Sequence, residues 1–149
     1  MLVLVVIAVV VSLVAPSLRG FFTSRQAADS AQTALSATKW AHWQAISQGQ
    51  PCRLNVDAQS GAFWLTVQQA GNYVAPSDDM GRRFTVPEGA TISLRSEAPD
   101  PNVTYVQFYP SGRSDVATIT IADDRGRAFQ ITCPSATEAF KIISPSEAH

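Results

Sequence analysis

The chain is poor in the side chains that carry most enzyme chemistry. Among its 149 residues there are only two histidines and two cysteines, and 15% of the residues are charged, with a formal net charge of −1. The two histidines are His42 and the last residue, His149, so a zinc site or a serine triad is hard to build. A net charge this close to zero gives no overall attraction to nucleic acid or to an anionic membrane. We therefore expect no enzyme, no cofactor and no metal.

What the chain does have is an apolar run at its beginning. Ser12 is the single polar residue among residues 1–15, and no charge occurs before Arg19. A helix of this length rises roughly 22 Å, which is less than the roughly 30 Å of a bilayer core. A secretory signal would have basic residues before the run and small residues at its end, whereas here Pro16 follows directly. The run is expected to be the remaining part of a longer membrane helix.

A second helical pattern follows and continues to about Ser47. Small residues recur at spacings of three and four, and so share one face of a helix, at Ala27, Ala31, Ala34, Thr38, Ala41 and Ala45. Small side chains on one face let a helix approach a sheet closely. Gly49 and Pro51 give a stop signal. Pro16 is expected to kink the combined helix, because proline removes a hydrogen-bond donor and crowds the preceding turn. Trp40 and Trp43 are expected to pack in the core.

From Cys52 onward the apolar period changes to two, which is typical of β-strands. The first two predicted strands form a hairpin around residues 57–61, and the last two enclose a turn at residues 123–126. The pattern predicts about seven strands, near residues 52–56, 63–67, 84–86, 90–94, 106–108, 118–121 and 129–133.

The fold class that follows is α+β, a long N-terminal helix packed on an antiparallel β domain. We divide the chain into a transmembrane or filament-core helix segment (residues 1–16), its amphipathic continuation (17–48) and the β domain (49–149). The segments 71–83 and 97–102 are expected to be exposed loops. Because binding residues concentrate on exposed loops, these two are candidates for partner contacts.

The two cysteines, Cys52 and Cys133, match no metal-ligand spacing. If the β domain lies outside the cytoplasm, a disulfide between them is expected. It would close a loop of about 80 residues, which the chain-entropy model values at about 4 to 5 kcal/mol. The alternative is two separate buried thiols, because cysteine packs as a small hydrophobic residue.

Arginine occurs repeatedly in predicted turns, often beside glycine. If several of these turns lie at one end of the domain, they would form a local patch for phosphate or for a partner protein. The alternative is that they are solvated turns. The candidate contact residues are Arg82, Arg83, Arg113, Arg125 and Arg127.

The order of these features resembles the type IV pilin-like subunits. The apolar start followed by V-A-P-S-L-R at residues 14–19 is similar to the pilin N-terminal helix. Residues 106–113, V-Q-F-Y-P-S-G-R, resemble the Phe-x-Pro-x-Gly segment of H-type minor pseudopilins of type II secretion and of FimT-type minor pilins. The hairpin from Ile119 to Ile131 follows as in that group, so the resemblance covers nearly the whole chain.

The resemblance implies a structural filament subunit with a pilin-like fold. The helix would lie in the bacterial inner membrane as a single pass, with the β domain in the periplasm, and would enter a periplasmic filament. The residues expected to carry assembly are Leu2, Val5, Val6, Val9, Leu13 and Pro16. The implied partners are other pseudopilins or pilins through this helix, prepilin peptidase on the full-length precursor, and tip subunits or secreted cargo. In the family a basic leader and a cleavage motif precede the helix, so an N-terminal truncation is expected.

Three functions remain in competition. The first is a minor pseudopilin at or near the tip of the type II secretion pseudopilus, supporting protein export. The second is a FimT-like minor pilin that binds DNA for uptake, but the tail 137–149 has only Lys141 against Glu138 and Glu147, so nucleic acid is not the expected partner. The third is a membrane-anchored enzyme, for which the sequence has no catalytic set.

The charges beside the apolar run bear on the orientation of the helix. Positive residues favour the cytoplasmic side of a membrane helix. Without a basic leader, Arg19 and Arg25 would therefore keep the β domain in the cytoplasm.

Overall fold

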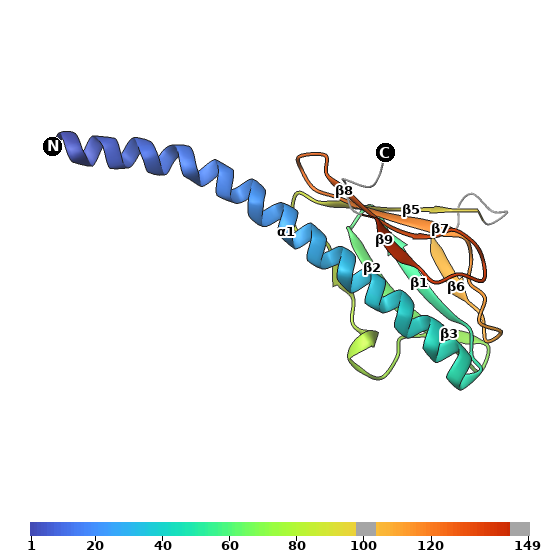
Figure 1. The fold of residues 1–149 in the computed structure, drawn as a ribbon. Helices are drawn as coiled ribbons and strands as arrows, with labels where there is room; N and C mark the ends of the chain where they lie inside the picture. Colours follow the sequence, from blue (N-terminus) through green and yellow to red (C-terminus); the bar gives the residue numbers. More distant parts are fainter. Residues whose placement is uncertain (98–103, 144–149) are drawn as a thin grey trace.

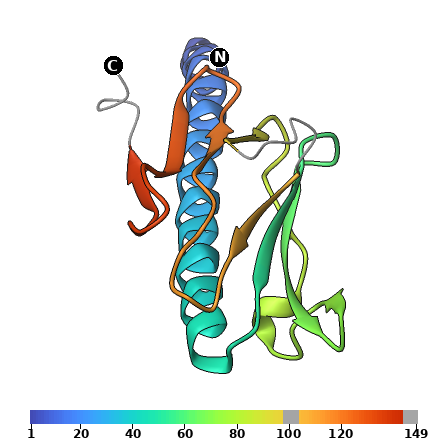
Figure 2. The ribbon, with the colours of Figure 1, turned by 90° about the vertical axis from the view of Figure 1, so that its right-hand side faces the viewer.

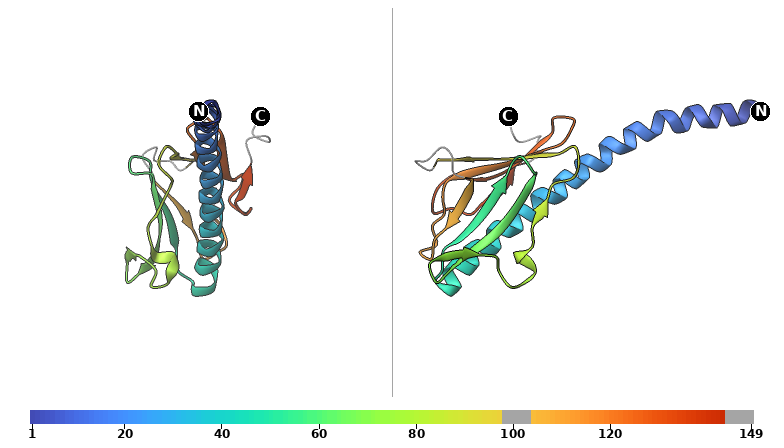
Figure 3. Two further views of the ribbon diagram at one scale, coloured as in Figure 1. Left: turned by 90° about the vertical axis from the view of Figure 1, so that its left-hand side faces the viewer. Right: turned by 180° about the vertical axis from the view of Figure 1, so that it is seen from behind.

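The computed structural model describes residues 1–97 and 104–143, and for residues 13–24 it describes the backbone alone. Its longest element is the helix α1 (Leu2–Gln48), which has 47 residues. The helix curves, and its first part projects far beyond the β domain while its last part lies along the domain (Figures 1 and 3). The helical assignment continues through Pro16. Gly49 ends the helix in the left-handed conformation, with φ of 64°, which glycine adopts at little cost.

The predicted small-residue face of α1 is confirmed as the face that packs on the domain. The five predicted alanines are fully buried and Thr38 is 1% exposed. Ala37 is buried as well and widens this face. The helix contacts strands of both sheets described below, and alanine side chains keep its axis close to them.

The two tryptophans of the helix differ in their surroundings. Trp40 packs against the hydrophobic core, as expected. Trp43 is 62% exposed, so the prediction that it packs in the core is wrong. At 100° per residue, Trp43 lies almost opposite the alanine face, and its indole therefore points away from the sheets.

The rest of the described chain forms two antiparallel sheets. Sheet A has the strand order β3-β2-β1-β6, and β4 also pairs with β2; sheet B has the order β5-β7-β8-β9. The strands are β1 (Cys52–Asp57), β2 (Ala62–Gln69), β3 (Asn72–Val74), β4 (Phe84–Thr85), β5 (Thr91–Ser96), β6 (Tyr105–Phe108), β7 (Ala117–Ala122), β8 (Ala128–Cys133) and β9 (Lys141–Ile143). A short 3₁₀ helix, η1 (Asp79–Gly81), lies between β3 and β4.

The core lies between α1 and the inner faces of the two sheets. Side chains alternate between buried and partly exposed along β1 and β7, as the period-two pattern predicted. Figure 2 shows α1 running behind the strands, with β1 and β2 on one side of it and the last strands on the other. The largest buried side chains include Phe63, Leu65, Phe108, Ile119 and Ile131.

The described residues hold nine strands where about seven were expected. Both additions are three residues long. Strand β3 lies inside the segment 71–83, which was expected to be a loop, and it pairs with β2. Strand β9 pairs with β8 near the C-terminus. Of the second expected loop, 97–102, only Glu97 lies within the described residues, and it is exposed.

Candidate functional site

The first candidate surface is the start of α1. Residues 1–12 are all exposed, and Leu2, Val5, Val6 and Val9 are between 52% and 82% exposed. The expected assembly residues Leu13 and Pro16 lie in residues 13–24, outside the described side chains. Among the described residues, no helix combines the length and the hydropathy that a membrane span requires. Exposed apolar patches of this size are typical of surfaces that contact a partner protein or a membrane.

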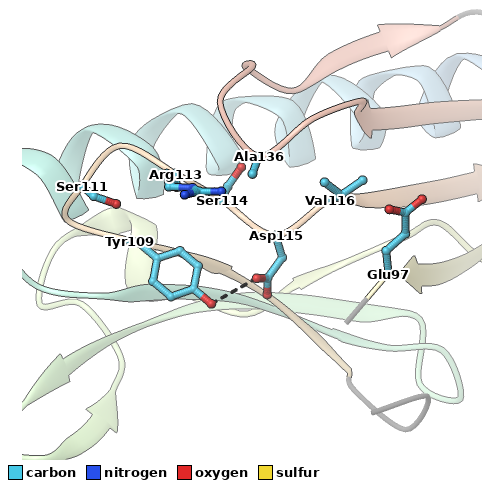
Figure 4. Close-up of a pocket in the computed structure, with 8 residues that line it drawn as sticks. All are labelled: Glu97, Tyr109, Ser111, Arg113, Ser114, Asp115, Val116 and Ala136. Atoms are coloured by element: carbon cyan, nitrogen blue, oxygen red, sulfur yellow. Dashed lines mark hydrogen bonds between the residues drawn. The ribbon is translucent and has the colours of Figure 1, made fainter. Parts of the chain in front are cut away.

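The second candidate surface is a cavity of about 500 Å³ in the β domain (Figure 4). It lies where the connection between β6 and β7 meets the end of β5 and the connection between β8 and β9. Its walls are Glu97, Tyr109, Ser111, Arg113, Ser114, Asp115, Val116 and Ala136.

A tight turn shapes one wall of this cavity. The Gly112 amide donates to the Tyr109 carbonyl at 3.0 Å, and the Tyr109 amide donates to the Arg113 carbonyl at 2.8 Å. Gly112 has φ of 90°, a backbone conformation that is strained for residues with a side chain. The turn therefore requires glycine here. The Phe-x-Pro-x-Gly segment of the sequence thus serves to reverse the chain at the mouth of the cavity.

Asp115 organises the polar side of the cavity. Its carboxylate accepts from the Tyr109 hydroxyl at 3.2 Å (Figure 4). It also accepts from the Gln107 backbone amide at 3.1 Å. Partial burial, and next to it the negative charge of Asp115, raise the pKa of Tyr109 above its usual value. The phenol therefore keeps its proton and donates to the carboxylate. Glu97 and Arg113 add one charge of each sign at the rim.

The residues that line this cavity contain no catalytic constellation. His42 lies on α1 beside a different, smaller cavity of about 110 Å³, and His149 lies outside the described residues. No group of three or more metal-binding side chains is present in the described part of the chain. Sequence reasoning identified Arg113 and the loop starting at Glu97, but missed Tyr109 and Asp115. The Tyr-Pro-Ser-Gly turn at residues 109–112 was the sequence signal that could have located this cavity.

The five candidate arginines do not form one patch. Arg113 is in the β6–β7 connection and Arg125 and Arg127 are in the β7–β8 turn, so opposite ends of β7 separate them. Arg83 is engaged: its guanidinium is 3.6 Å from the Asp57 carboxylate and donates to Ser60 at 3.1 Å. Arg82 lies over the ring of Phe84, at 4.8 Å from its centroid.

Cys52 and Cys133 are free, buried thiols, so the expected disulfide is not what the structure has. Cys52 begins β1 in sheet A and Cys133 ends β8 in sheet B. Cys52 pairs with Phe108, Phe108 forms a bridge with Ser114, and the Ser114 hydroxyl contacts the Cys133 thiol. The Cys133 thiol donates instead to the Ser135 carbonyl, at 2.8 Å. Burial raises the pKa of the Cys52 thiol to about 11. The alternative of two separate thiols packed as small hydrophobic residues describes both sites.

Comparison with known proteins connects these surfaces to a family. The family model of type II transport protein GspH matches residues 30–136, which is more than half of the chain. The search of curated protein sequences gives no match.

Solved structures share the fold. The minor pseudopilin EpsH from the type 2 secretion system of Vibrio cholerae superposes with a TM-score of 0.70 at 19% identity, covering 82% of this chain and 99% of EpsH. The type IV minor pilin FimU of Pseudomonas aeruginosa gives a TM-score of 0.58 at 20% identity, covering 86% of this chain and 96% of FimU.

These matches confirm the predicted pilin-like α+β fold and the resemblance to the H-type minor pseudopilins. The family match includes most of the packed part of α1, strands β1 to β8 and the Phe-x-Pro-x-Gly turn. On this evidence the chain belongs to the GspH family of type II transport proteins.

Proposed function

We propose that this protein is a minor pseudopilin, a structural subunit at or near the tip of a type II secretion pseudopilus that supports protein export. One observation carries the proposal. A single helix is apolar and uncovered over residues 1–12 and packed on its own domain over its last half. Membership of the GspH family and the likeness to the EpsH fold support this reading.

The energetics of the uncovered stretch favour assembly with other helices. Covering one Val or Leu side chain contributes about 1.5 to 3 kcal/mol, and α1 leaves at least nine such large apolar side chains exposed over residues 2–11. Lipid and a bundle of similar helices both provide this cover. A subunit that exchanges lipid contacts for helix contacts can therefore leave the membrane and join a filament.

The proposed location rests on family membership and on the exposed apolar start of α1. Family membership implies a periplasmic filament that is anchored at the inner membrane. We propose that this chain is a single-pass inner-membrane protein with its β domain in the periplasm before assembly. Its helix partners would be other pseudopilins, and prepilin peptidase would process the precursor.

For the tip partner or the secreted cargo, the first candidate contact region is the cavity beside Tyr109 and Asp115. The exposed Glu97 at its rim begins the loop that sequence analysis also favoured. The segment 71–83 is the second candidate, because most of it is exposed although it contains β3 and η1. The residues that line the cavity are mostly polar and include the hydrogen-bonded pair Tyr109 and Asp115, which suits contact with a peptide loop.

The DNA-uptake alternative receives no support from the arginine positions, because the five candidates are divided between separate turns. Binding along a nucleic-acid backbone needs several cations within reach of neighbouring phosphates.

The test is to express the protein from its own gene locus, with an affinity tag, in cells with and without prepilin peptidase. We expect a peptidase-dependent loss of mass and co-purification with the other pseudopilins. The matched control carries Val6→Asp, which should retain the folded domain and lose co-purification. Unchanged mass together with isolation of the protein alone would refute the proposal.

A further inference from the structure

Two of the three tyrosines, Tyr73 and Tyr105, flank one arginine on the outer face of sheet A. Arg53 on β1 places its guanidinium carbon 3.7 Å from the ring centroid of Tyr73 on β3, and 4.0 Å from that of Tyr105 on β6. Tyr109, which follows β6, is near enough for Tyr105 and Tyr73 to contribute to its raised pKa. Stacking on two rings orders a guanidinium that would otherwise sample many rotamers.

The strand register explains this arrangement. Arg53 pairs with Thr66 on β2 and with Gln107 on β6, so its side chain starts from the middle of the sheet. Tyr73 lies two strands away on one side and Tyr105 one strand away on the other. The Arg53 Nε donates to the Gln107 side-chain oxygen at 3.2 Å, which fixes the orientation of the guanidinium plane.

The ordered cation has no acidic partner within the described part of the chain. Arg83, by contrast, combines a ring contact with Trp64 at 4.3 Å and the ion pair to Asp57. The side chains beside Arg53 on this face are neutral: Asn55, Thr66, Gln68 and Gln107. Asp115, which lies beside Gln107, accepts from the Gln107 backbone amide and from the Tyr109 hydroxyl. The face therefore presents one fixed positive charge framed by rings and amides.

We propose that this face, defined by Arg53, Tyr73, Tyr105 and Gln107, binds an Asp or Glu side chain of a neighbouring pseudopilin, with its carboxylate on the Arg53 guanidinium. A planar guanidinium held in one orientation matches a carboxylate with two parallel hydrogen bonds. Tyrosine, tryptophan and arginine are the residue types that dominate binding energy at protein interfaces. The inference rests on the proposed function, because the neighbour is taken to be a filament subunit.

A protein carboxylate is favoured over a nucleic-acid phosphate by the charge of the surroundings. A phosphate backbone carries one charge per nucleotide and is bound by several cations along its path. Within the described residues, sheet A offers Arg53 alone on this part of its face, while Arg83 at the far end is paired with Asp57. A single fixed cation among neutral side chains fits a single carboxylate.

The experiment places a photo-crosslinking amino acid at Thr66, next to Arg53, in the full protein made with the other pseudopilins of its system. A second probe at Thr120 is the matched control, because Thr120 has the same exposure class on the outer face of sheet B. Each probe is combined with wild-type Arg53, with Arg53→Met, which keeps the apolar stem, and with Arg53→Lys, which keeps the charge. Binding of a labelled single-stranded DNA oligonucleotide is measured on the same samples.

We expect the Thr66 probe to crosslink one pseudopilin and the Thr120 probe to give none of that product. Arg53→Met should lower the crosslinked yield by roughly tenfold or more, and Arg53→Lys by less, while co-purification through α1 persists. In the wild type, which needs no folding control, the yield at Thr66 should fall as salt is raised.

Equal yields with and without the Arg53 charge, or a yield in the wild type that salt does not change, would overturn the inference and leave the proposed function standing. If the wild type binds the DNA oligonucleotide and Arg53→Met does not, the ligand of Arg53 is a phosphate and the proposed carboxylate is wrong. Failure to co-purify with any pseudopilin would overturn the proposed function and this inference together.

Discussion

The two ends of α1 are built from the same regular backbone and differ in where their apolar side chains point. In the first part, large branched residues such as Val6, which is 55% exposed, surround the helix on every side. In the second part, alanines such as Ala34 are fully buried on one face, while Arg25, Asp29 and Lys39 are exposed on others. One continuous helix therefore carries an uncovered apolar surface in its first part and, in its second part, an alanine face that is covered by the sheets.

This difference in side-chain size indicates which contacts each part makes. Alanine lets a helix approach a sheet closely, but each side chain contributes little apolar area. Leucine and valine contribute more area and keep neighbouring helices further apart. The second part of α1 therefore stabilises the domain, and the first part is free to stabilise an assembly. Substitutions in the two parts should affect different measurements.

The largest expected effect comes from a charge in the first part. Val6→Asp should abolish membrane retention and co-assembly, because an aspartate in an apolar helix core costs about 3 kcal/mol. The same variant should leave the thermal unfolding midpoint of the β domain unchanged, since Val6 is exposed and the first part of α1 projects beyond the domain (Figure 1). Membrane fractionation and circular dichroism check the two halves of this expectation. A lowered midpoint would show that the two parts of α1 are not energetically separate.

A matched pair of substitutions tests the second part. Ala34→Leu adds three carbon atoms at a fully buried position and should lower the free energy of unfolding by about 1 to 3 kcal/mol through overpacking. Ala8→Leu adds the same atoms at an exposed position and should leave it unchanged. Urea unfolding of both variants measures the difference. Equal stabilities would mean that the helix does not press closely on the sheets.

Strand β1, which follows α1, allows a test of how stability depends on pH. Cys52 begins β1, and burial raises its thiol pKa from 9.0 to about 11. The unfolded thiol ionises first as pH rises, so the folded state binds more protons between these values and stability falls across that window. The loss should be about 2 kcal/mol at pH 11 and only a few tenths of a kcal/mol at pH 9.

Cys52→Ala should remove this component of the pH dependence, and unfolding curves of the two proteins between pH 8 and pH 11 measure it. Parallel curves would contradict the burial of the thiol. The native Cys52 should also resist alkylation at neutral pH, because the thiolate is the reactive form.

The elements with strong local periodicity were predictable from the sequence, and the short ones were not. The spacing of Ala27, Ala31 and Ala34 predicted the packed face, and Ala37 was missed because it lies at the edge of that spacing. Strand β3 lies among glycine and aspartate residues that predict a loop, and its pairing with β2 overrides this local signal. The disulfide was expected because cysteine counts say nothing of which sheet each strand joins.

The candidate surfaces could be predicted only in part. The apolar start of α1 was evident, since exposure there follows from the run itself. The cavity beside Tyr109 is lined by three connections that are distant in sequence, and no spacing rule links Glu97 to Ala136. The stack on Arg53 depends on strand order: Tyr73 reaches it across β2, which sequence separation does not indicate.

The smallest expected effect concerns the one polar residue in the alanine face. Thr38 is 1% exposed, and its hydroxyl donates to the Leu35 carbonyl at 2.6 Å within the helix. Thr38→Val keeps the shape and removes a donor together with its burial cost, so the free energy of unfolding should change by less than about 1 kcal/mol. Thr38→Ala, the control, leaves empty space beside the small cavity formed with Phe108 and Phe140 and should cost more than the valine. If valine proved the more damaging of the two, the hydroxyl and not the volume would hold this part of α1 to the sheets.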